Sequence, residues 1–379
     1  MRRAFKYRLY PNRTQRRELD AALETHRRLY NAALGARKAA YAADKTSLKY
    51  AQQSAAFKAE RATNPYYARL NFSSAQATLR RLDKAYAAFF RRVKAGGGKP
   101  GFPRFKARDR FDTVEYPKNG DGIRLTGNRL RVQHVGTVRV KVHRPHAGEV
   151  KTVSLKREGD RWYVILSCDL GGAAAPPPHP GPAVGIDVGL EHFLTTSDGD
   201  HVANPRPLKA ALPKLRRLQR AVSRKKRGGS NRRKACKRVA RLHARVANVR
   251  KDVHRKTALE LVRRYGTIAV EKLDIRGMLG NHRLARSIAD AAWGGFLLTL
   301  RSKAESAGCE YVEVDCRGTS QECSGCGIVV RKDLSVRTHH CPSCSLVLQR
   351  DVNAAKNILA RARSARTGPT GLNSDGGVS

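Results

Sequence analysis

Residues 183–190, AVGIDVGL, decide the fold of the second half of this 379-residue chain. Val184, Ile186 and Val188 alternate as in a buried β-strand. Asp187 therefore points to the opposite face of that strand. A carboxylate is costly to bury unless it is paired or binds a metal ion. Asp187 is thus a candidate functional residue, and the plainer alternative is an aspartate that caps a turn at the strand end.

Two further carboxylates follow in the same α/β pattern. Residues 267–273, TIAVEKL, predict a second buried strand that carries Glu271. Residues 350–359, RDVNAAKNIL, predict a helix with Asp351 in its first turn, where the helix dipole favours a carboxylate. A sheet of the RNase H type would bring Asp187, Glu271 and Asp351 together. Such oxygen ligands suit two Mg²⁺ ions about 3.5–4 Å apart, and Mn²⁺ accepts similar ligands.

Four of the eight cysteines form two CxxC pairs, Cys323 with Cys326 and, after fourteen intervening residues, Cys341 with Cys344. Tetrahedral Zn²⁺ binds four thiolates, so two such turns at this distance predict a zinc ribbon with one structural ion. The alternative is a redox role, for which one pair would suffice. Eight cysteines are too few for a disulfide scaffold in a chain this long, which favours a reduced, cytoplasmic protein.

The first half of the chain has a different pattern. Residues 111–170 contain short alternating strands that predict a small barrel, and residues 4–12, AFKYRLYPN, predict an N-terminal strand that can join it. The helices expected between these strands are then an insertion in the barrel. A proline-rich linker at residues 171–182 separates the two halves.

The inserted helices have recognisable boundaries and faces. Asn12 and Gln15 form a capping-box pattern at the start of the first helix. The third helix begins near Ser73, and its apolar residues recur at helical spacing, which predicts one buried seam. The residues of that seam are Leu79, Leu82, Tyr86, Phe89 and Val93.

The composition indicates a polyanionic partner. The formal net charge is +45 and the sequence pI is about 10.9, while 40% of the residues are hydrophobic. The chain should fold, and a charge this large repels itself unless a polyanion such as nucleic acid screens it. No segment approaches the length of about 18 apolar residues that a membrane span needs, and the N-terminus shows no secretory signal. We expect no membrane partner and a cytoplasmic protein that is nucleoid-associated when on DNA.

Three segments are candidates for nucleic-acid contacts. Residues 214–256 contain nineteen Lys or Arg against one Asp and predict a basic helical hairpin. Residues 96–110 form a Gly/Pro-rich loop in which phenylalanines interleave with basic residues, as suits stacking on unpaired bases. A polar ridge follows the third helix. Solvated helix faces, and phenylalanines that anchor the loop to its own core, are the alternatives. The candidate contacts are Gln76, Arg80, Lys84, Phe102, Arg104, Phe105, Lys106, Arg224, Lys225, Lys226, Arg227, Arg232 and Arg233.

Several motifs together resemble one known family, the transposon-encoded TnpB (OrfB-type) proteins related to type V CRISPR effectors. The resemblance extends over nearly the whole chain. The motifs that carry it are FKYRLYPN (5–12), SSAQATLRRLDKAYAAFFRR (73–92), GFPRFK (101–106), GIDVGL (185–190), VEKL (270–273), TSQECSGCG (319–327) and RDVNAAKNIL (350–359).

The resemblance implies an α+β multidomain protein with two lobes. Its N-terminal lobe would be a wedge β-barrel with an inserted helical recognition domain, and its C-terminal lobe a RuvC-like (RNase H-like) α/β nuclease with an inserted zinc ribbon. In the N-terminal lobe we expect the barrel at 1–12 and 107–170 and the helical insertion at 13–106, followed by the linker at 171–182. In the C-terminal lobe we expect the nuclease at 183–318 and 346–362, the ribbon at 319–345 and a disordered tail at 363–379. The ribbon would bind target nucleic acid.

The resemblance also implies a function, which is RNA-guided cleavage of double-stranded DNA next to a short flanking motif by Mg²⁺-dependent hydrolysis. Asp187, Glu271 and Asp351 match the catalytic triad of the family, and the four cysteines of the CxxC pairs match its zinc ligands. The partners would be a guide RNA transcribed from the transposon end, with one protein per guide RNA, and the target DNA. The alternatives are a transposase that performs strand transfer with the same triad and a nuclease-inactive, RNA-guided repressor. A repressor should have lost a carboxylate, and this chain keeps all three.

Overall fold

The computed structural model describes residues 2–96, 100–172, 176–333 and 335–367. The chain divides into two compact units, Met1–Ala173 and Ala174–Ser379. The predicted linker at 171–182 includes this division, and its residues 173–175 lie outside the described residues. Among the helices described, none is long and apolar enough to cross a membrane.

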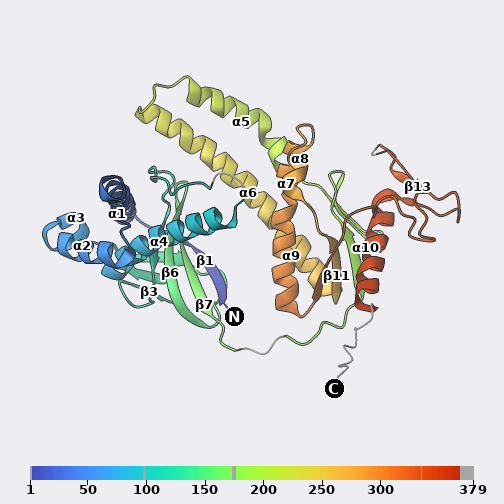
Figure 1. The fold of residues 1–379 in the computed structure, drawn as a ribbon, viewed down its shortest axis with the longest axis horizontal. Helices are drawn as coiled ribbons and strands as arrows, with labels where there is room; N and C mark the ends of the chain where they lie inside the picture. The colour runs from blue at the N-terminus through green and yellow to red at the C-terminus, as the bar shows by residue number, and fades with distance from the viewer. Residues whose placement is uncertain (1, 97–99, 173–175, 334, 368–379) are drawn as a thin grey trace, which may run out of the picture. The chain divides into compact units, whose positions relative to one another are not determined.

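The first unit contains a curled antiparallel sheet (Figure 1). The N-terminal strand β1 lies between β7 and β5, as predicted for a strand that joins the later ones. The pairing ends at β2 and β3, so the sheet described is curled but is not closed by hydrogen bonds into the predicted barrel. The strands are β1 (Arg2–Tyr10), β2 (Thr113–Tyr116), β3 (Ile123–Thr126), β4 (Arg129–Val132), β5 (Gly136–Lys141), β6 (Glu149–Glu158) and β7 (Arg161–Asp169), in the order β2-β6-β7-β1-β5-β4-β3.

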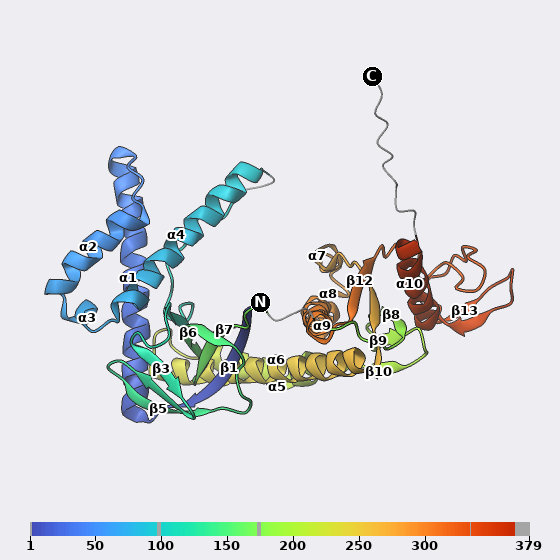
Figure 2. The same cartoon turned by 90° about the horizontal axis from the view of Figure 1, so that it is seen from below.

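Four helices follow β1 in the chain: α1 (Arg13–Asp44), α2 (Tyr50–Thr63), α3 (Pro65–Ala68) and α4 (Phe72–Ala95). The capping box is confirmed, because the Gln15 amide donates to Asn12 Oδ1 over 2.8 Å and the Asn12 amide to Gln15 Oε1 over 3.1 Å. The predicted seam of α4 is buried at Leu79 and Leu82, but it is wrong at Val93, which is 50% exposed. The C-terminal end of α4 diverges from α1 and α2 (Figure 2), and before it does so Tyr86 contacts Arg37 of α1, 4.9 Å from ring centroid to guanidinium.

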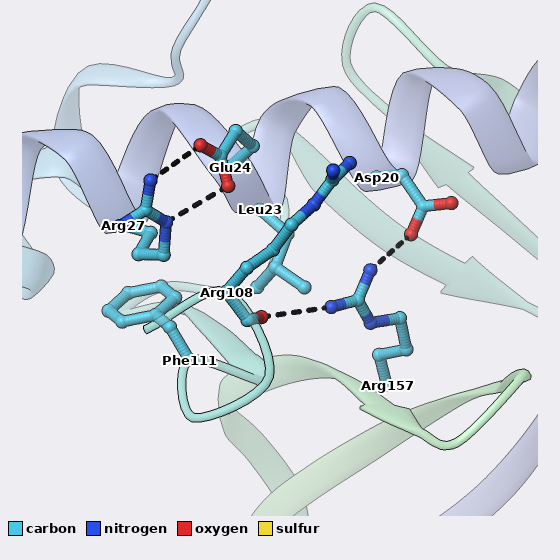
Figure 3. Close-up of a pocket in the computed structure, with 7 residues that line it drawn as sticks. All are labelled: Asp20, Leu23, Glu24, Arg27, Arg108, Phe111 and Arg157. Atoms are coloured by element: carbon cyan, nitrogen blue, oxygen red, sulfur yellow. Dashed lines mark hydrogen bonds and ion pairs between the residues drawn. The ribbon is translucent and has the colours of Figure 1, made fainter. Parts of the chain in front are cut away.

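A charged hollow marks where the loop before β2 meets α1 (Figure 3). Arg27 pairs with Glu24 of the same helix, and Arg157 of β6 donates to Asp20 of α1 and to the backbone oxygen of Arg108. These contacts fasten the helical segment to the sheet. Both carboxylates of the hollow are paired with arginines, so we assign the hollow a structural role.

The second unit contains a mixed five-stranded sheet. β8, β11 and β12 run parallel, and β9 and β10 form antiparallel hairpins with their neighbours. A turn at Asp198 and Gly199 joins β9 to β10, and Gly199 has φ of +93°, which favours glycine. The strands are β8 (Ala183–Asp187), β9 (His192–Thr196), β10 (His201–Ala203), β11 (Thr267–Glu271) and β12 (Glu310–Val314), in the order β10-β9-β8-β11-β12.

Helices cover both faces of this sheet. Val184, Ile186 and Val270 pack on one face with residues of α6 and α9, while Ala269 on the other face packs with Ile358 of α10. α5 and α6 lie side by side as the predicted basic hairpin (Figures 1 and 2). The remaining elements are α5 (Pro207–Ser223), α6 (Ser230–Arg264), α7 (Ile275–Met278), α8 (Ala285–Ala291), α9 (Trp293–Ala307), β13 (Thr338–His340), β14 (Val347–Gln349) and α10 (Arg350–Thr367).

Two expected boundaries differ from the elements observed. α10 continues to Thr367, so residues 363–367 are helical, although we assigned them to a disordered tail. Residues 368–379 of that tail lie outside the described residues. β13 pairs with β14 through Thr338 and Gln349, so this hairpin extends past residue 345, where the predicted ribbon ends. In α10 the helical hydrogen bonds continue beyond residue 362, and in the β13–β14 hairpin the strand pairing continues beyond residue 345.

Candidate active site and cysteine cluster

Asp187 and Glu271 end two neighbouring parallel strands. The apolar pattern predicted a strand that continues past Asp187 to Val188, but Asp187 is the last residue of β8, as Glu271 is of β11. Ile186 pairs with Val270 in the parallel register, so the two acidic residues that follow are neighbours at the same edge of the sheet. The alternation of side chains places both on the face that packs against α10.

A glycine allows α10 to approach this face closely. A Cβ atom added at Gly185 would lie 2.0 Å from the backbone oxygen of Ala355 and 2.8 Å from the amide nitrogen of Leu359. The helix backbone therefore rests directly on β8. Asp351 lies four residues before Ala355, on the same side of the helix. This close packing directs the third predicted carboxylate toward the first.

The charges of the other two carboxylates act on Asp187. Burial, followed by the charges of Glu271 and Asp351, raises the pKa of Asp187 well above its usual range, and Arg350 acts in the opposite direction. Burial also raises the pKa of Glu271, against a hydrogen bond donated by Thr319 and the charge of Arg361. A bound cation would relieve this repulsion, and the oxygen donors match those that Mg²⁺ prefers.

The four predicted cysteine ligands also meet, and we call them the cysteine cluster. Their Sγ atoms all lie within 4.8 Å of one another, and no other group in the described part of the chain gathers metal-ligating side chains in this way. Two pairs join one cysteine of each CxxC turn, at 3.6 Å for Cys323 with Cys344 and 3.5 Å for Cys326 with Cys341. A tetrahedral site with Zn–S bonds of about 2.3 Å has sulfur–sulfur separations of about 3.8 Å. The donor set fits Zn²⁺, and the contacts across the turns favour a metal over a redox pair.

Backbone amides support the thiolate form within this cluster. The amides of Cys344 and Ser343 bond the sulfur of Cys341, and the first of these has the larger effect in lowering its pKa. The Gly325 amide also donates to Cys323 Sγ over 3.4 Å. A Cβ atom at Gly325 would stand 3.5 Å from Cys344 Sγ, so the knuckle turn holds the sulfur atoms close together.

Only some side chains of the polar ridge predicted on α4 are exposed and could contact a partner. Arg80 and Lys84 are exposed, and the Arg80 guanidinium lies 5.1 Å from the ring centroid of Tyr50. Gln76 is half-buried and donates to Ser54 Oγ over 3.3 Å. A role in binding nucleic acid stays a prediction for this ridge, and Gln76 has a structural contact as well.

The two phenylalanines of the loop are not the buried anchors that were the alternative expectation. Phe102 packs edge-on against Tyr86 and Phe89, with ring centroids 5.4 and 5.1 Å apart, yet it is 42% exposed. Phe105 is 53% exposed, and the Lys38 ammonium lies 5.4 Å from its ring. Neither ring is a buried anchor. The exposed rings remain candidates for stacking on bases.

The basic residues of the loop and the hairpin turn are mostly exposed. Lys106 is half-buried, and its backbone oxygen accepts hydrogen bonds from Arg27 and Asn31. Arg232 is also half-buried and donates to the backbone oxygens of two residues across the α5–α6 turn, so it closes that turn. The exposed members of the predicted set are Arg104, Arg224, Lys225, Lys226, Arg227 and Arg233.

The sequence analysis missed a basic face on the first sheet. Three register pairs, Arg124 with Arg131, Arg129 with Arg139, and Arg8 with Lys141, align cationic side chains across β3, β4, β5 and β1. Tyr10 sits among them, with the guanidinium groups of Arg8 and Arg139 each 5.1 Å from its ring centroid. The alternation of basic and buried apolar residues in RLRV (129–132) and TVRVK (137–141) is the pattern that could have revealed it. We call these six cations and Tyr10 the basic sheet face.

Three family models match parts of the chain. The model OrfB_IS605, described as "Probable transposase", matches residues 139–282, and the model described as "Cas12f1-like, TNB domain" matches residues 293–358, which include the cysteine cluster. A model described as "Helix-turn-helix domain" matches residues 1–46. In the structure this last stretch holds β1 and the single long helix α1.

Whole-length relatives extend these matches. The chain is 35% identical over 373 residues to a "Putative RNA-guided DNA endonuclease" of Streptomyces pristinaespiralis, which covers 96% of this chain and 90% of the relative. It is 29% identical to the "Putative RNA-guided DNA endonuclease InsQ" of Escherichia coli (strain K12), over 94% of this chain and 91% of the relative. The solved mini-RNA-guided endonuclease CRISPR-Cas phi3 has a similar fold at 10% identity, with a TM-score of 0.50 over 96% of this chain and 92% of that one. The chain belongs to the TnpB (OrfB-type) family of transposon-encoded RNA-guided DNA endonucleases.

Proposed function

We propose that this protein is an RNA-guided endonuclease that cuts double-stranded DNA and that Asp187, Glu271 and Asp351 form its active site. The observation that carries the proposal is the placement of Asp187 and Glu271 at neighbouring strand ends, where burial and the charges of Glu271 and Asp351 raise the pKa of Asp187. Perturbed acidic groups that converge in this way are typical of catalytic sites. The full-length similarity to proteins named as RNA-guided DNA endonucleases supports the same conclusion.

The residues of the site have separable tasks. We propose that the three carboxylates hold Mg²⁺, with Mn²⁺ as a substitute, and that two such ions would activate the attacking water and stabilise the leaving oxygen. Asp187 and Glu271 are fixed by the sheet, and Asp351 by the start of α10. Partial burial limits access of bulk water to the carboxylates and strengthens their electrostatic interactions. The neighbouring Arg350 lowers the net negative charge without becoming a ligand itself.

We propose that Cys323, Cys326, Cys341 and Cys344 bind one structural Zn²⁺. Four protein ligands complete a tetrahedral site and leave no position for a reacting group. The ion would hold together two knuckle turns that share little apolar core, since Cys326 and Cys344 are exposed. The surrounding ribbon, near residues 319–345, would contact target nucleic acid.

The domain assignment follows from the strand orders. We propose that the second sheet, with its order β10-β9-β8-β11-β12, is the RuvC-like nuclease core, because β8 and β9 form a hairpin and β11 and β12 run parallel to β8. This is the arrangement of an RNase H-like sheet. The curled first sheet would be the wedge domain, and the helices between β1 and β2 its recognition insertion.

The nucleic-acid partners would be a guide RNA from the transposon end and a double-stranded target, with one protein per guide RNA. Phosphate neutralisation is the main source of affinity for such partners. The α5–α6 hairpin and the basic sheet face supply the charge, and the exposed rings of Phe102 and Phe105 supply stacking surfaces. Sequence readout would come from base pairing with the guide.

Strand transfer is the second candidate function, because one matching family model is described as a probable transposase. Hydrolysis and strand transfer use the same metal chemistry, so their products must separate them. The test loads purified protein with its copurifying RNA, identified by sequencing, and incubates it with matched duplexes that have randomised flanks. Cut ends that depend on the guide support the nuclease. Joined products would indicate strand transfer, and stable binding without cutting would indicate a repressor.

A further inference from the structure

Helix α10 has two buried stripes with different chemistry. An apolar stripe that includes Ala355, Ile358 and Ala362 packs on the sheet. A polar stripe at spacings of three, four and four residues faces the segment that leads from β12 into the first CxxC turn. The residues of this polar stripe are Arg350, Asn353, Asn357 and Arg361.

Two asparagines of the polar stripe hold the first CxxC turn. Asn353 is fully buried, donates to the backbone oxygen of Glu322 over 2.7 Å and accepts from the amide of Ser324 over 2.9 Å. Asn357 is 6% exposed and donates over 2.8 Å to the backbone oxygens of Thr319 and Glu322. Buried amides are costly unless they are bonded. These two are bonded to the backbone that flanks Cys323.

Two arginines hold the same region from the ends of the stripe. Arg361 donates to both carboxylate oxygens of Glu322 over 2.8 Å and to the backbone oxygen of Asp315. Arg350 donates to the backbone oxygens of Asp333 and Val336, on the segment between the two CxxC turns. Helix α10 is thus bonded to the chain on both sides of the first CxxC turn, before it at Glu322 and after it at Asp333 and Val336.

Thr319 connects this assembly to the carboxylate site. Its side chain is buried, and its hydroxyl donates to Glu271 Oε1. Its backbone oxygen is the acceptor for Asn357. Glu271 therefore has a fixed donor on one oxygen, and the position of that donor depends on the base of the ribbon. A chain of buried hydrogen bonds runs from the CxxC turn, through α10, to the carboxylate.

We propose that Thr319 is a positioning residue for Glu271 and that the cysteine ribbon, through the asparagines of α10, holds it in place. This inference rests on the proposed nuclease function. The ribbon would then serve cleavage as well as contact with nucleic acid. Partners that orient a metal ligand typically change metal affinity or activity by about 10- to 100-fold when they are removed. Coupling of this kind is reciprocal, so loosening Thr319 should also loosen the ribbon.

The test compares three variants of the guide-loaded protein. T319V removes the hydroxyl at nearly constant volume, and T319S restores it. T267V is the matched control, because Thr267 also donates to a glutamate, Glu310, from the opposite end of β11. We expect T319V to cut the target about 10- to 100-fold more slowly with unchanged DNA affinity. T319S should recover most of the rate, and T267V should match the wild type. A wild-type rate in T319V, or no recovery in T319S, would overturn the proposal.

A second measurement does not require cleavage. The release of Zn²⁺ from the ribbon to a coloured chelator such as 4-(2-pyridylazo)resorcinol is followed by absorbance. We expect release from T319V to be several-fold faster than from wild type and T267V, because the base of the ribbon has lost a contact. Identical release rates in T319V and wild type would contradict the coupling, whatever the DNA assay shows. Failure of the wild type to cut DNA, with faster release from T319V, would refute the nuclease but not the linkage.

Discussion

The cysteine cluster and the carboxylate site are built in opposite ways, although both belong to the second unit. The cysteines come from two short turns within 22 residues of chain, and backbone amides of those turns bond their sulfur atoms. The carboxylates come from two strand ends and a helix start, spread from residue 187 to residue 351. Local chain geometry assembles the first site, whereas the second needs the whole sheet and the packing of α10.

This difference shows how each site should respond to change. A local site with a metal ion gains its folding free energy from the ion itself. A site of converging carboxylates opposes folding through burial and repulsion until a cation arrives, and the sheet must hold it in place. The predictions below test this contrast, in order of decreasing expected effect.

Removal of one carboxylate should abolish cleavage and leave binding. D187A, E271A and D351A should each cut at least about 10³-fold more slowly, and the triple variant should be no worse, because residues that act as one unit are not additive. Affinity comes from base pairing and phosphate contacts, so the dissociation constant for target DNA should change little. Mg²⁺ chelation should mimic the variants, and Mn²⁺ should restore wild-type activity. Guided cutting that survives D187A would remove this site from the mechanism.

Replacement of a cysteine should affect the ribbon alone. C326S should lose the single Zn²⁺ and unfold the segment near residues 319–349, while the first unit keeps its melting transition. Metal analysis by mass spectrometry and limited proteolysis measure the two effects. A folded, active wild-type protein without zinc would contradict the assignment. C236S, at an exposed cysteine outside the cluster, is the control.

Tight packing against the sheet makes Gly185 sensitive. G185A would place a methyl group 2.0 Å from the backbone oxygen of Ala355, so α10 must shift away from β8. We expect a loss of about 1–3 kcal/mol in the free energy of unfolding of the second unit, with reduced cleavage because Asp351 moves with the helix. G101A is a control, since nothing lies within 4 Å of a Cβ atom there. Equal denaturation midpoints for the two variants would refute the packing argument.

Charge removal on the α5–α6 hairpin should weaken binding without touching either site. Replacing Arg224, Lys226 and Arg233 by Gln should lower RNA affinity and reduce the slope of log affinity against log salt by about 0.7–0.9 per lost phosphate contact. Fluorescence anisotropy at several salt concentrations measures this slope. R301Q, at an exposed arginine paired with Glu305, is the control. Binding that does not depend on salt would show that this hairpin is not an electrostatic surface.

The smallest effect concerns pH and Asp187. Because its pKa is raised in the folded protein, this group destabilises the fold at pH values above its unfolded pKa of about 4, and the penalty disappears as the pH falls to that value. In Mg²⁺-free buffer at pH 7, D187N should therefore raise the free energy of unfolding by on the order of 1 kcal/mol. Thermal unfolding from pH 7 to pH 4 should show the gain shrinking. Added Mg²⁺ should stabilise the wild type more than D187N.

Sequence patterns were sufficient where structure depends on near neighbours. The capping box of Asn12 and Gln15 and the spacing of the cysteines are both local features, and both appear in the structure as predicted. The pattern failed at Val93, because helical periodicity identifies an apolar face but does not show where its packing partner ends. In the same way, the apolar alternation continues to Val188 and does not show that β8 ends at Asp187.

Contacts between distant segments were invisible in the sequence. The hydrogen bond from Thr319 to Glu271 joins residues 48 positions apart, and Asn357 looks like an ordinary polar residue until its two backbone acceptors are known. The basic sheet face likewise depends on strand register, which aligns arginines from separate strands.

The sequence by itself determined the charge, the linker, the two CxxC turns, the three acidic residues and the family resemblance. Only the tertiary structure decided that Asp187 and Glu271 are neighbours and that the helix carrying Asp351 packs on β8, because these placements require the parallel register of β8 and β11 and the close approach of α10 at Gly185. It also decided that the first CxxC turn and Glu271 share one hydrogen-bond network through Thr319 and α10. The reason is physical: a metal-binding turn is specified by residues a few bonds apart, whereas a converging site depends on the packing of elements that are distant in the chain.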